Sequence, residues 1–202
     1  GKPLAERYIG NTNLMDEHRK KKLLKNYHPG KLPTDLSRPY FELSKGQDAV
    51  TQMETCDLNL WMVGDILLKA DKMSMANSLE LRVPFLDKKM LELSTRIPSR
   101  YRAANETTKI ALRGAAIKQL PERTANKKKL GFPVPLNDWL REDKYYNKVK
   151  AAFQSDIAEK FFVTSELMKL LDDHKSGKAL NMQKIWSFYT FILWYEQFFV
   201  LN

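Results

Sequence analysis

The sequence predicts an all-α fold, and three observations support this class. The alternation of apolar and polar residues that marks strands between turns is absent. Stretches with apolar residues three or four positions apart follow one another along the chain, and most of them end at a proline or a glycine. The 202 residues are 43% hydrophobic and 29% charged, which is the composition of a soluble globular protein with a core.

The first half is expected to alternate helices with irregular segments. Asn13 can cap the first helix, and clustered prolines and glycines predict the loop that follows it. Further on, Val83 is kept out of the α region by Pro84. The elements expected here are a helix over 15–27, a loop over 29–46, two helical stretches over 48–75 and an extended segment over 79–86.

The second half is expected to be helical nearly throughout. Asp87 can cap a helix whose apolar residues Met90, Leu91 and Leu93 would face inward. Gly177 is a natural end for a later helix. The expected helices are 88–97, one opened by Thr107 or Thr108 and running to 120, a short one near Asn137, one capped by Thr164 or Ser165 and ending at 175, and an aromatic helix over 180–199.

Several site types are excluded by what the sequence lacks. Cys56 is the only cysteine, so no internal disulfide or CxxC site can form, and we expect a packing role and a reducing cytoplasm. The glycines never cluster into a phosphate-binding loop. No histidine has a second ligand at metal-binding spacing, so we expect no metal site and a surface role for His18 and His174. The most apolar stretch, 185–195, is shorter than the roughly 20 residues of a membrane span and predicts a buried helix.

Residues 65–87, DILLKADKMSMANSLELRVPFLD, contain the first informative cluster of charges. Asp65 and Lys69 are four residues apart on one helical face, and Asp71 lies beside them. Such a pair is by itself a surface ion pair, which contributes a few tenths of a kcal/mol. Glu80 and Arg82 would point the same way from an extended segment and form a half-buried pair that fixes the turn at VPFLD.

Residues 125–140, ANKKKLGFPVPLNDWL, place three lysines directly before a stiff segment. The run is either a solvated face or a loop that is held rigidly toward an anion. The net charge of +10, together with HRKKKLLK at 18–25, keeps a basic nucleic-acid-binding module as an alternative. The two lysine runs are about a hundred residues apart, and the aromatic residues gather at the C-terminus, which argues against that alternative.

Both blocks resemble successive blocks in the synthetase domain of the glutamine-hydrolysing asparagine synthetases, the asparagine synthetase B family. The opening PLAERYIGN and the aromatic tail with Trp186 and Trp194 are similar to the flanking segments, so the resemblance covers nearly the whole chain. It implies that residues 1–202 are the C-terminal helical portion of an α/β synthetase domain of the adenine-nucleotide α-hydrolase-like type. The glutaminase domain and the SGGxDS pyrophosphate loop of that family are absent from this sequence.

The resemblance also implies a reaction. The family uses ATP and magnesium to convert aspartate to β-aspartyl-AMP, which ammonia derived from glutamine then turns into asparagine. For this chain alone we expect no catalysis and no bound ATP or magnesium. Its expected partners are aspartate, ATP and ammonia in the full-length enzyme, together with the missing N-terminal synthetase and glutaminase regions. We expect no membrane partner, and we expect self-association through apolar helix faces that a sheet would otherwise cover.

Site residues follow from the same resemblance. The family places an essential lysine three residues before the Phe of the GF turn, which is Lys129 before Phe132 here, or Lys128 if the register shifts by one. A lysine held by a glycine and two prolines can neutralise the charge of a developing adenylate and a departing pyrophosphate.

Five further residues match the family motif in the first block. The resemblance places Asp65, Lys69 and Asp71 at the cleft for the substrate and the intermediate, either contacting substrate or supporting residues that do. Glu80 and Arg82 are expected to be structural.

Overall fold

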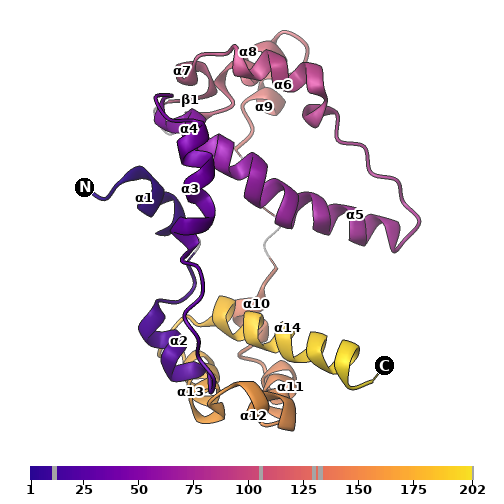
Figure 1. Cartoon of the computed structure of the whole chain (residues 1–202). Helices are drawn as coiled ribbons and strands as arrows, with labels where there is room; N and C mark the ends of the chain where they lie inside the picture. Colours follow the sequence, from indigo (N-terminus) through magenta and orange to yellow (C-terminus); the bar gives the residue numbers. More distant parts are fainter. Residues whose placement is uncertain (11–12, 105–106, 129–130, 132–133, 202) are drawn as a thin grey trace. The chain divides into compact units, whose positions relative to one another are not determined.

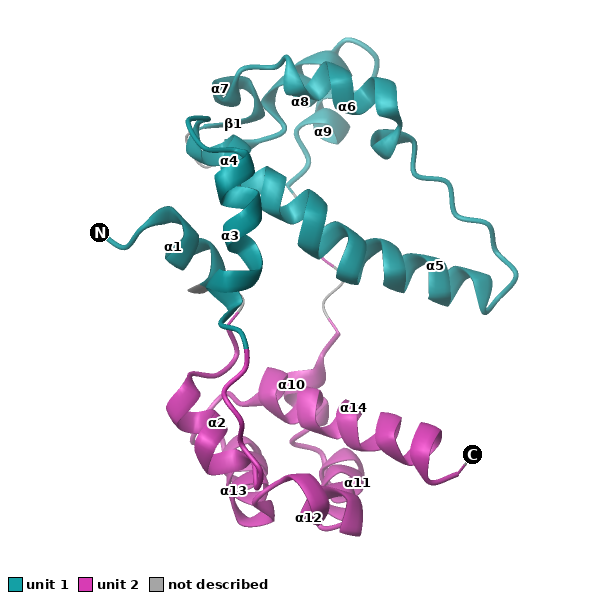
Figure 2. Ribbon diagram, viewed as in Figure 1, with its two compact units in different colours: residues 1–11, 31–130 teal, residues 12–30, 131–202 magenta. Residues whose placement is uncertain are grey.

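The computed structural model describes residues 1–10, 13–104, 107–128, 131 and 134–201. The described chain is mostly helical, which confirms the expected class (Figure 1). It divides into two compact units, each built from two stretches of sequence (Figure 2). Unit 1 comprises residues 1–11 and 31–130, and unit 2 comprises residues 12–30 and 131–202.

Unit 1 is a set of short helices around one long helical run. Its elements are α1 (Leu4–Gly10), α3 (Pro33–Leu43), α4 (Ala49–Cys56), η1 (Asp57–Leu67), α5 (Leu68–Met75), η2 (Pro84–Leu86), α6 (Lys88–Thr95), α7 (Ser99–Arg102), β1 (Ala103–Ala104), β2 (Thr107–Thr108), α8 (Ile110–Ile117) and α9 (Glu122–Ala125).

The long run joins α4, η1 and α5 without a break, where two stretches were expected. Asp48 caps its start, because its carboxylate accepts hydrogen bonds from the backbone N–H groups of Val50 and Thr51. The middle segment, η1, is π-helical over eleven residues, which is far longer than the single turns in which this form is usually found. Cys56 is fully buried at the end of α4, as expected for a packing residue.

Helix α3 corrects the loop expected over 29–46. Pro33 occupies the first turn, where a missing N–H costs nothing, and the Asp35 carboxylate accepts a hydrogen bond from the N–H of Leu32 at 3.1 Å. Pro39 lies inside the helix and does not end it. The helix therefore forms despite a composition that resembles a loop.

A two-stranded antiparallel hairpin corrects the helix start expected at Thr107 or Thr108. Ala103 pairs with Thr108, and Ala104 pairs with Thr107. Helix α8 then begins at Ile110, preceded by Lys109 in the left-handed conformation. This hairpin is the one β-sheet among the described residues.

Asp87 caps helix α6, as expected, since its carboxylate accepts a hydrogen bond from the N–H of Lys89 at 2.9 Å. The expected inward face was wrong. Met90, Leu91 and Leu93 are 36%, 44% and 55% exposed, because unit 1 offers no layer on that side of the helix.

Unit 2 has the larger core. Its elements are α2 (Glu17–Leu23), α10 (Leu136–Trp139), α11 (Asp143–Phe153), α12 (Asp156–Phe161), α13 (Thr164–Lys175) and α14 (Met182–Phe199). The core residues are Leu23, Leu140, Val149, Phe153, Ala158, Phe162, Leu167, Leu171, Ile185, Phe188 and Ile192. A bridge between Leu24 and Phe162 joins the early segment of the chain to this later one.

The helix ends of unit 2 differ in detail from the expected ones. Asp16, and not Asn13, caps α2, through a hydrogen bond from the N–H of Arg19 at 2.8 Å. Helix α13 starts at Thr164 with no side-chain cap. Gly177 follows α13 with a φ of +78°, the left-handed geometry expected of it.

His174 corrects the expected surface role. Its side chain is fully buried, its Nδ1 accepts the N–H of Asn181 at 3.2 Å, and its Nε2 lies 3.0 Å from the carbonyl oxygen of Asn137. Since Nδ1 accepts, Nε2 carries the proton and donates it to that carbonyl. His174 therefore joins three segments of unit 2.

Unit 1 leaves much apolar surface uncovered. Its most exposed large apolar side chains include Leu43, Val63, Met73, Leu79 and Phe85. The aromatic helix of unit 2 also exposes Trp194 and Phe198. Over the described ranges, no helix combines the length and the hydropathy that a membrane crossing requires.

Candidate functional site

Asp65 and Lys69 are brought together by the long helical run. Lys69 Nζ lies 3.8 Å from Asp65 Oδ1, with the two side chains 63% and 53% exposed. The other carboxylate oxygen of Asp65 accepts a hydrogen bond from Trp61 Nε1 at 2.9 Å. Trp61 thus fixes the rotamer of Asp65 from one helical turn before it.

Asp71 lies one turn further on and takes no part in this pair. Its side chain is exposed and has no hydrogen bond or ion pair within the described part of the chain. The sequence placed it beside Asp65 and Lys69, and the structure leaves it as a separate carboxylate on the first turn of α5.

Glu80 and Arg82 form the expected pair in the extended segment after α5. Arg82 Nη2 lies 2.6 Å from Glu80 Oε1. The side chains are 71% and 82% exposed, so the expected half-burial was wrong. An exposed pair of this kind contributes less than about 1 kcal/mol.

Lys129, the predicted catalytic lysine, lies outside the described residues, and so does Phe132. Its neighbours Lys127 and Lys128 are described and exposed. The base of this lysine segment is attached to unit 1 through Ala125, which is buried.

Arg113 ties the lysine segment to helix α8. Its Nη1 donates hydrogen bonds to the carbonyl oxygens of Ala125 at 2.9 Å and Lys127 at 3.1 Å. Its Nε donates to the carbonyl oxygen of Thr108 at 3.1 Å. One guanidinium therefore joins the end of the hairpin, the first turn of α8 and the base of the lysine segment.

Lys109 is a candidate that sequence reasoning missed. It has a φ of +59° and a ψ of +35°, a strained conformation for a residue with a side chain, and it caps the eight-residue helix α8. Its side chain is exposed. Non-glycine residues held in this conformation gather at functional sites. No residue pattern marks the position in advance, since Asn and Asp are the usual non-glycine residues there.

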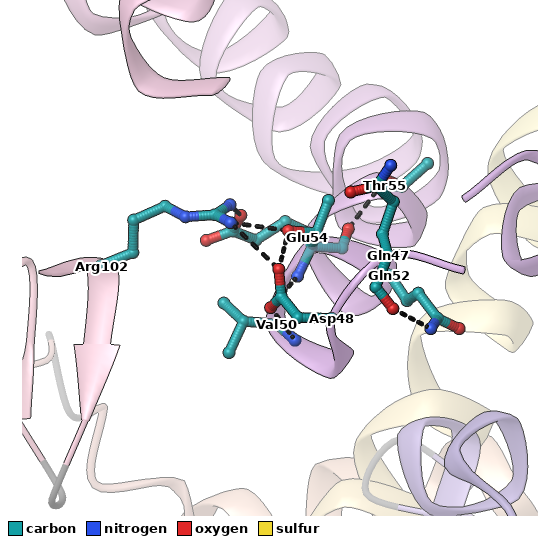
Figure 3. A network of polar contacts seen from close by, with 8 residues as sticks. Gln47, Asp48, Val50, Gln52, Glu54, Thr55 and Arg102 are labelled. Atoms are coloured by element: carbon teal, nitrogen blue, oxygen red, sulfur yellow. Dashed lines mark hydrogen bonds and ion pairs between the residues drawn. The ribbon is translucent and has the colours of Figure 1, made fainter. Parts of the chain in front are cut away.

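A polar network joins Arg102, at the end of α7, to residues at the start of α4 and along it (Figure 3). Arg102, the last residue of α7, forms ion pairs with Asp48, which caps α4, and with Glu54 on α4. These residues line an open cavity of about 580 Å³, and Thr51, Thr55 and four other serine or threonine residues also line it.

The described residues do not form a metal centre. No group of three or more His, Cys, Asp or Glu side chains comes together in residues 1–10, 13–104, 107–128, 131 and 134–201.

Comparison with known sequences identifies the family. The model of the protein family described as "Asparagine synthase" matches residues 2–196. The chain belongs to the asparagine synthase family. It is 44% identical over 194 residues to "Asparagine synthetase [glutamine-hydrolyzing] 1" of Bacillus subtilis (strain 168), and the match covers 96% of this chain and 30% of that protein.

Two further relatives agree. "Putative asparagine synthetase [glutamine-hydrolyzing]" of Mycobacterium tuberculosis (strain ATCC 25618 / H37Rv) is 37% identical over 195 residues, which are 96% of this chain and 30% of that protein. "Asparagine synthetase [glutamine-hydrolyzing] 3" of Bacillus subtilis is 32% identical over 121 residues, which are 59% of this chain and 20% of that protein. No solved structure matches this member of the asparagine synthase family. Two of these relatives match nearly the whole of this chain, but the chain spans only about a third of their length.

Proposed function

We propose that this chain is the C-terminal helical part of the synthetase domain of a glutamine-hydrolysing asparagine synthetase. The observation that carries the proposal is the 44% identity over 96% of the chain to a protein of that name. In this proposal the remaining two thirds of the polypeptide supply the glutaminase domain, the ATP pyrophosphate loop and the sheet that covers the exposed faces of unit 1.

The proposed reaction has two steps. The β-carboxylate of aspartate attacks the α-phosphorus of ATP and expels pyrophosphate, which gives β-aspartyl-AMP. Ammonia then attacks the acyl carbon, AMP leaves, and asparagine is formed. Charge builds up on the departing pyrophosphate in the first step, and positioned cations lower its energy there.

Lys129 is the first candidate for that cation, on the resemblance of the GF turn. Lys109 is the second, on its strained left-handed backbone at the start of α8. Arg113 ties the base of the lysine segment to α8, which favours a role for both lysines in one cationic site. Asp65, Lys69 and Asp71 would line the cleft, with Trp61 orienting Asp65.

Magnesium belongs to the proposal for the whole enzyme. When bound, it would neutralise phosphate oxygens of ATP. We assign it no ligand among the described residues of this chain. We also propose that the isolated 202 residues neither bind ATP nor make asparagine.

The experiment that tests the proposal uses the longer native polypeptide. Asparagine formation from aspartate, ATP and ammonia is measured for Lys129→Ala, Lys128→Ala and Lys109→Ala. Loss of a cation that acts on the departing group should lower kcat by about 100-fold, the cost of losing one such contact. Lys127→Ala, on an exposed neighbour, is the matched control and should retain activity.

Full activity of all three variants would remove the proposed cationic site. Absence of any ATP-dependent amide formation by the unaltered polypeptide would remove the ligase itself. A full rate in Lys129→Ala with a large loss in Lys109→Ala would move the catalytic role to the start of α8.

A further inference from the structure

The guanidinium of Arg102 is fixed on helix α4. Its Nη2 donates a hydrogen bond to Thr51 Oγ1 at 2.6 Å and lies 3.5 Å from Asp48 Oδ2, and its Nη1 donates to Glu54 Oε2 (Figure 3). The Arg102 side chain is only 17% exposed, although the Asp48 and Glu54 side chains are 43% and 45% exposed. A planar group held at both terminal nitrogens can neither rotate nor slide.

Only the two terminal nitrogens of the Arg102 guanidinium have hydrogen-bond or ion-pair partners among the described residues. Its Nε is buried and has no hydrogen-bond partner among the described residues. Leaving a buried donor unpaired is costly, so the contacts at the other two nitrogens must offset that cost. The polar contacts of this side chain are therefore all made with α4 and with Asp48, the residue that caps it.

The backbone of Arg102 leads directly to Lys109. The carbonyl oxygen of Arg102 accepts the N–H of Lys109 at 2.7 Å. Between the two residues lies the hairpin, with two residues in each strand. A hairpin this short is not stable alone, so its position depends on contacts outside it.

Those contacts are made by the residue that precedes its first strand and by the last residue of its second strand. At the first end, Arg102 holds the hairpin to α4. At the second end, Arg113 Nε holds the carbonyl oxygen of Thr108 at 3.1 Å and the same side chain holds the base of the lysine segment. A left-handed lysine persists only where its surroundings over-determine it. The contacts of Arg102 and Arg113 supply that constraint.

We propose that Arg102 is a positioning residue, which fixes the strained Lys109 at the start of α8 by anchoring the hairpin to α4. Through Arg113 the same anchor reaches the base of the lysine segment. The proposal rests on the proposed function in that it makes Lys109 and the lysine segment the groups whose position matters for turnover.

The anchor can be tested on the 202-residue chain without any activity. Hydrogen exchange of the Lys109 amide is measured by NMR in Arg102→Ala and in Arg100→Ala. Arg100 is the matched control, because it lies two residues earlier on α7, is exposed, and stacks only on Tyr101. We expect exchange of the Lys109 amide to become at least about tenfold faster in Arg102→Ala and to stay unchanged in Arg100→Ala.

Equal exchange in the two variants, with the amides of Val149 and Phe153 in the unit 2 core still protected, would overturn the anchor. If Arg102→Ala does not fold, the double variant Asp48→Asn, Glu54→Gln replaces it. That variant removes both carboxylate charges and keeps the shapes of the side chains. It should also speed exchange at Lys109, and unaltered exchange there would again refute the proposal.

The consequence for the reaction is tested in the longer polypeptide. Arg102→Ala should lower kcat by about 10- to 100-fold, because a shift of about 1 Å in a catalytic group has that effect. KM for aspartate and for ATP should change less than about threefold, since Arg102 itself does not contact substrate. Arg102→Lys should recover little, because one ammonium cannot reproduce the fork of contacts.

The two tests separate the two ideas. Faster exchange at Lys109 together with full turnover in Lys109→Ala, Lys128→Ala and Lys129→Ala would keep the anchor and remove the proposed cationic site. Loss of turnover in the lysine variants with full turnover in Arg102→Ala would remove the positioning role.

Discussion

At the residue scale, Asp48 combines two tasks in one carboxylate. It caps α4 through the N–H groups of Val50 and Thr51, and it also receives the Thr51 hydroxyl at 2.7 Å and the Arg102 guanidinium at 3.5 Å. The hydrogen bond from the Thr51 side chain is the main cause that lowers the pKa of Asp48, with backbone hydrogen bonds and Arg102 adding to it. The charged form is therefore the one that the fold stabilises.

The lowered pKa of Asp48 predicts a pH dependence. Its stabilising effect is complete above the unfolded pKa of about 3.9 and is lost as the pH falls through the lower folded value. Asp48→Asn keeps a good cap and removes the charge, so it should cost less than about 1 kcal/mol at pH 7. Urea unfolding of both proteins from pH 7 to pH 2.5 should show the difference shrinking below about pH 4. A difference that grows toward acid would contradict the assignment.

His174 is a second residue whose role comes from its contacts. His174→Leu keeps the bulk and leaves the N–H of Asn181 and the carbonyl of Asn137 without partners in a buried place. Each of the two unpaired groups costs about 1–3 kcal/mol, so the free energy of unfolding should fall by about 2–6 kcal/mol. Chemical denaturation measures this, with the exposed His18→Leu as control. Equal stability of the two variants would refute the structural role.

At the scale of elements, the start of α8 stores strain in a single residue. Lys109→Ala and Lys109→Gly both remove the ammonium, but only glycine adopts the left-handed conformation without cost. We therefore expect the glycine variant to be more stable than the alanine variant by about 1 kcal/mol in thermal or chemical unfolding. The reverse order would mean that Lys109 is not held in this conformation in solution.

Some helix ends with one local signal were predictable, although the cap expected at Asn13 was wrong, and elements that need distant partners were not. Asp87 and Gly177 act as expected, because a cap and a left-handed terminus depend on neighbouring residues only. Helix α3 was missed because Pro33 was taken for a breaker, although it fits a first turn. The hairpin was missed because two-residue strands are too short to show alternation.

In the candidate site too, local contacts were predictable from the sequence and long-range contacts were not. The pair of Asp65 and Lys69 follows from helical spacing alone. The network of Arg102 with Asp48 and Glu54 joins residues about fifty positions apart, and one sequence contains no sign of such a pairing. Burial was the least predictable property, as Met90, Leu91 and His174 show, because it depends on which layers surround an element.

At the scale of the whole molecule, the two units differ in how they are held together. Unit 2 has a continuous apolar core, whereas unit 1 exposes many large apolar side chains. Amide exchange should therefore be slower in the cores of α11, α13 and α14 than in α5 and α6. Equal protection throughout would show that unit 1 has stabilising contacts beyond those described.

The uncovered apolar surface of unit 1 predicts self-association of the isolated chain. Light scattering should give a mass above that of one chain, and the mass should rise with protein concentration. Leu43→Ser and Val63→Ser, on strongly exposed positions, should lower it, whereas Lys22→Ser on the charged face of α2 should not. A mass of one chain at every concentration would count against this prediction.

The wide turns of η1 have a consequence for how this region tolerates changes in length. A π-helical turn uses about one residue more than an α-helical turn, so deleting a single residue between 57 and 67 could be absorbed by local tightening. A full π-helical turn that tightens into a full α-helical turn still covers the same angle, so a deletion absorbed in this way would leave the side chains of α4 and α5 facing their original directions.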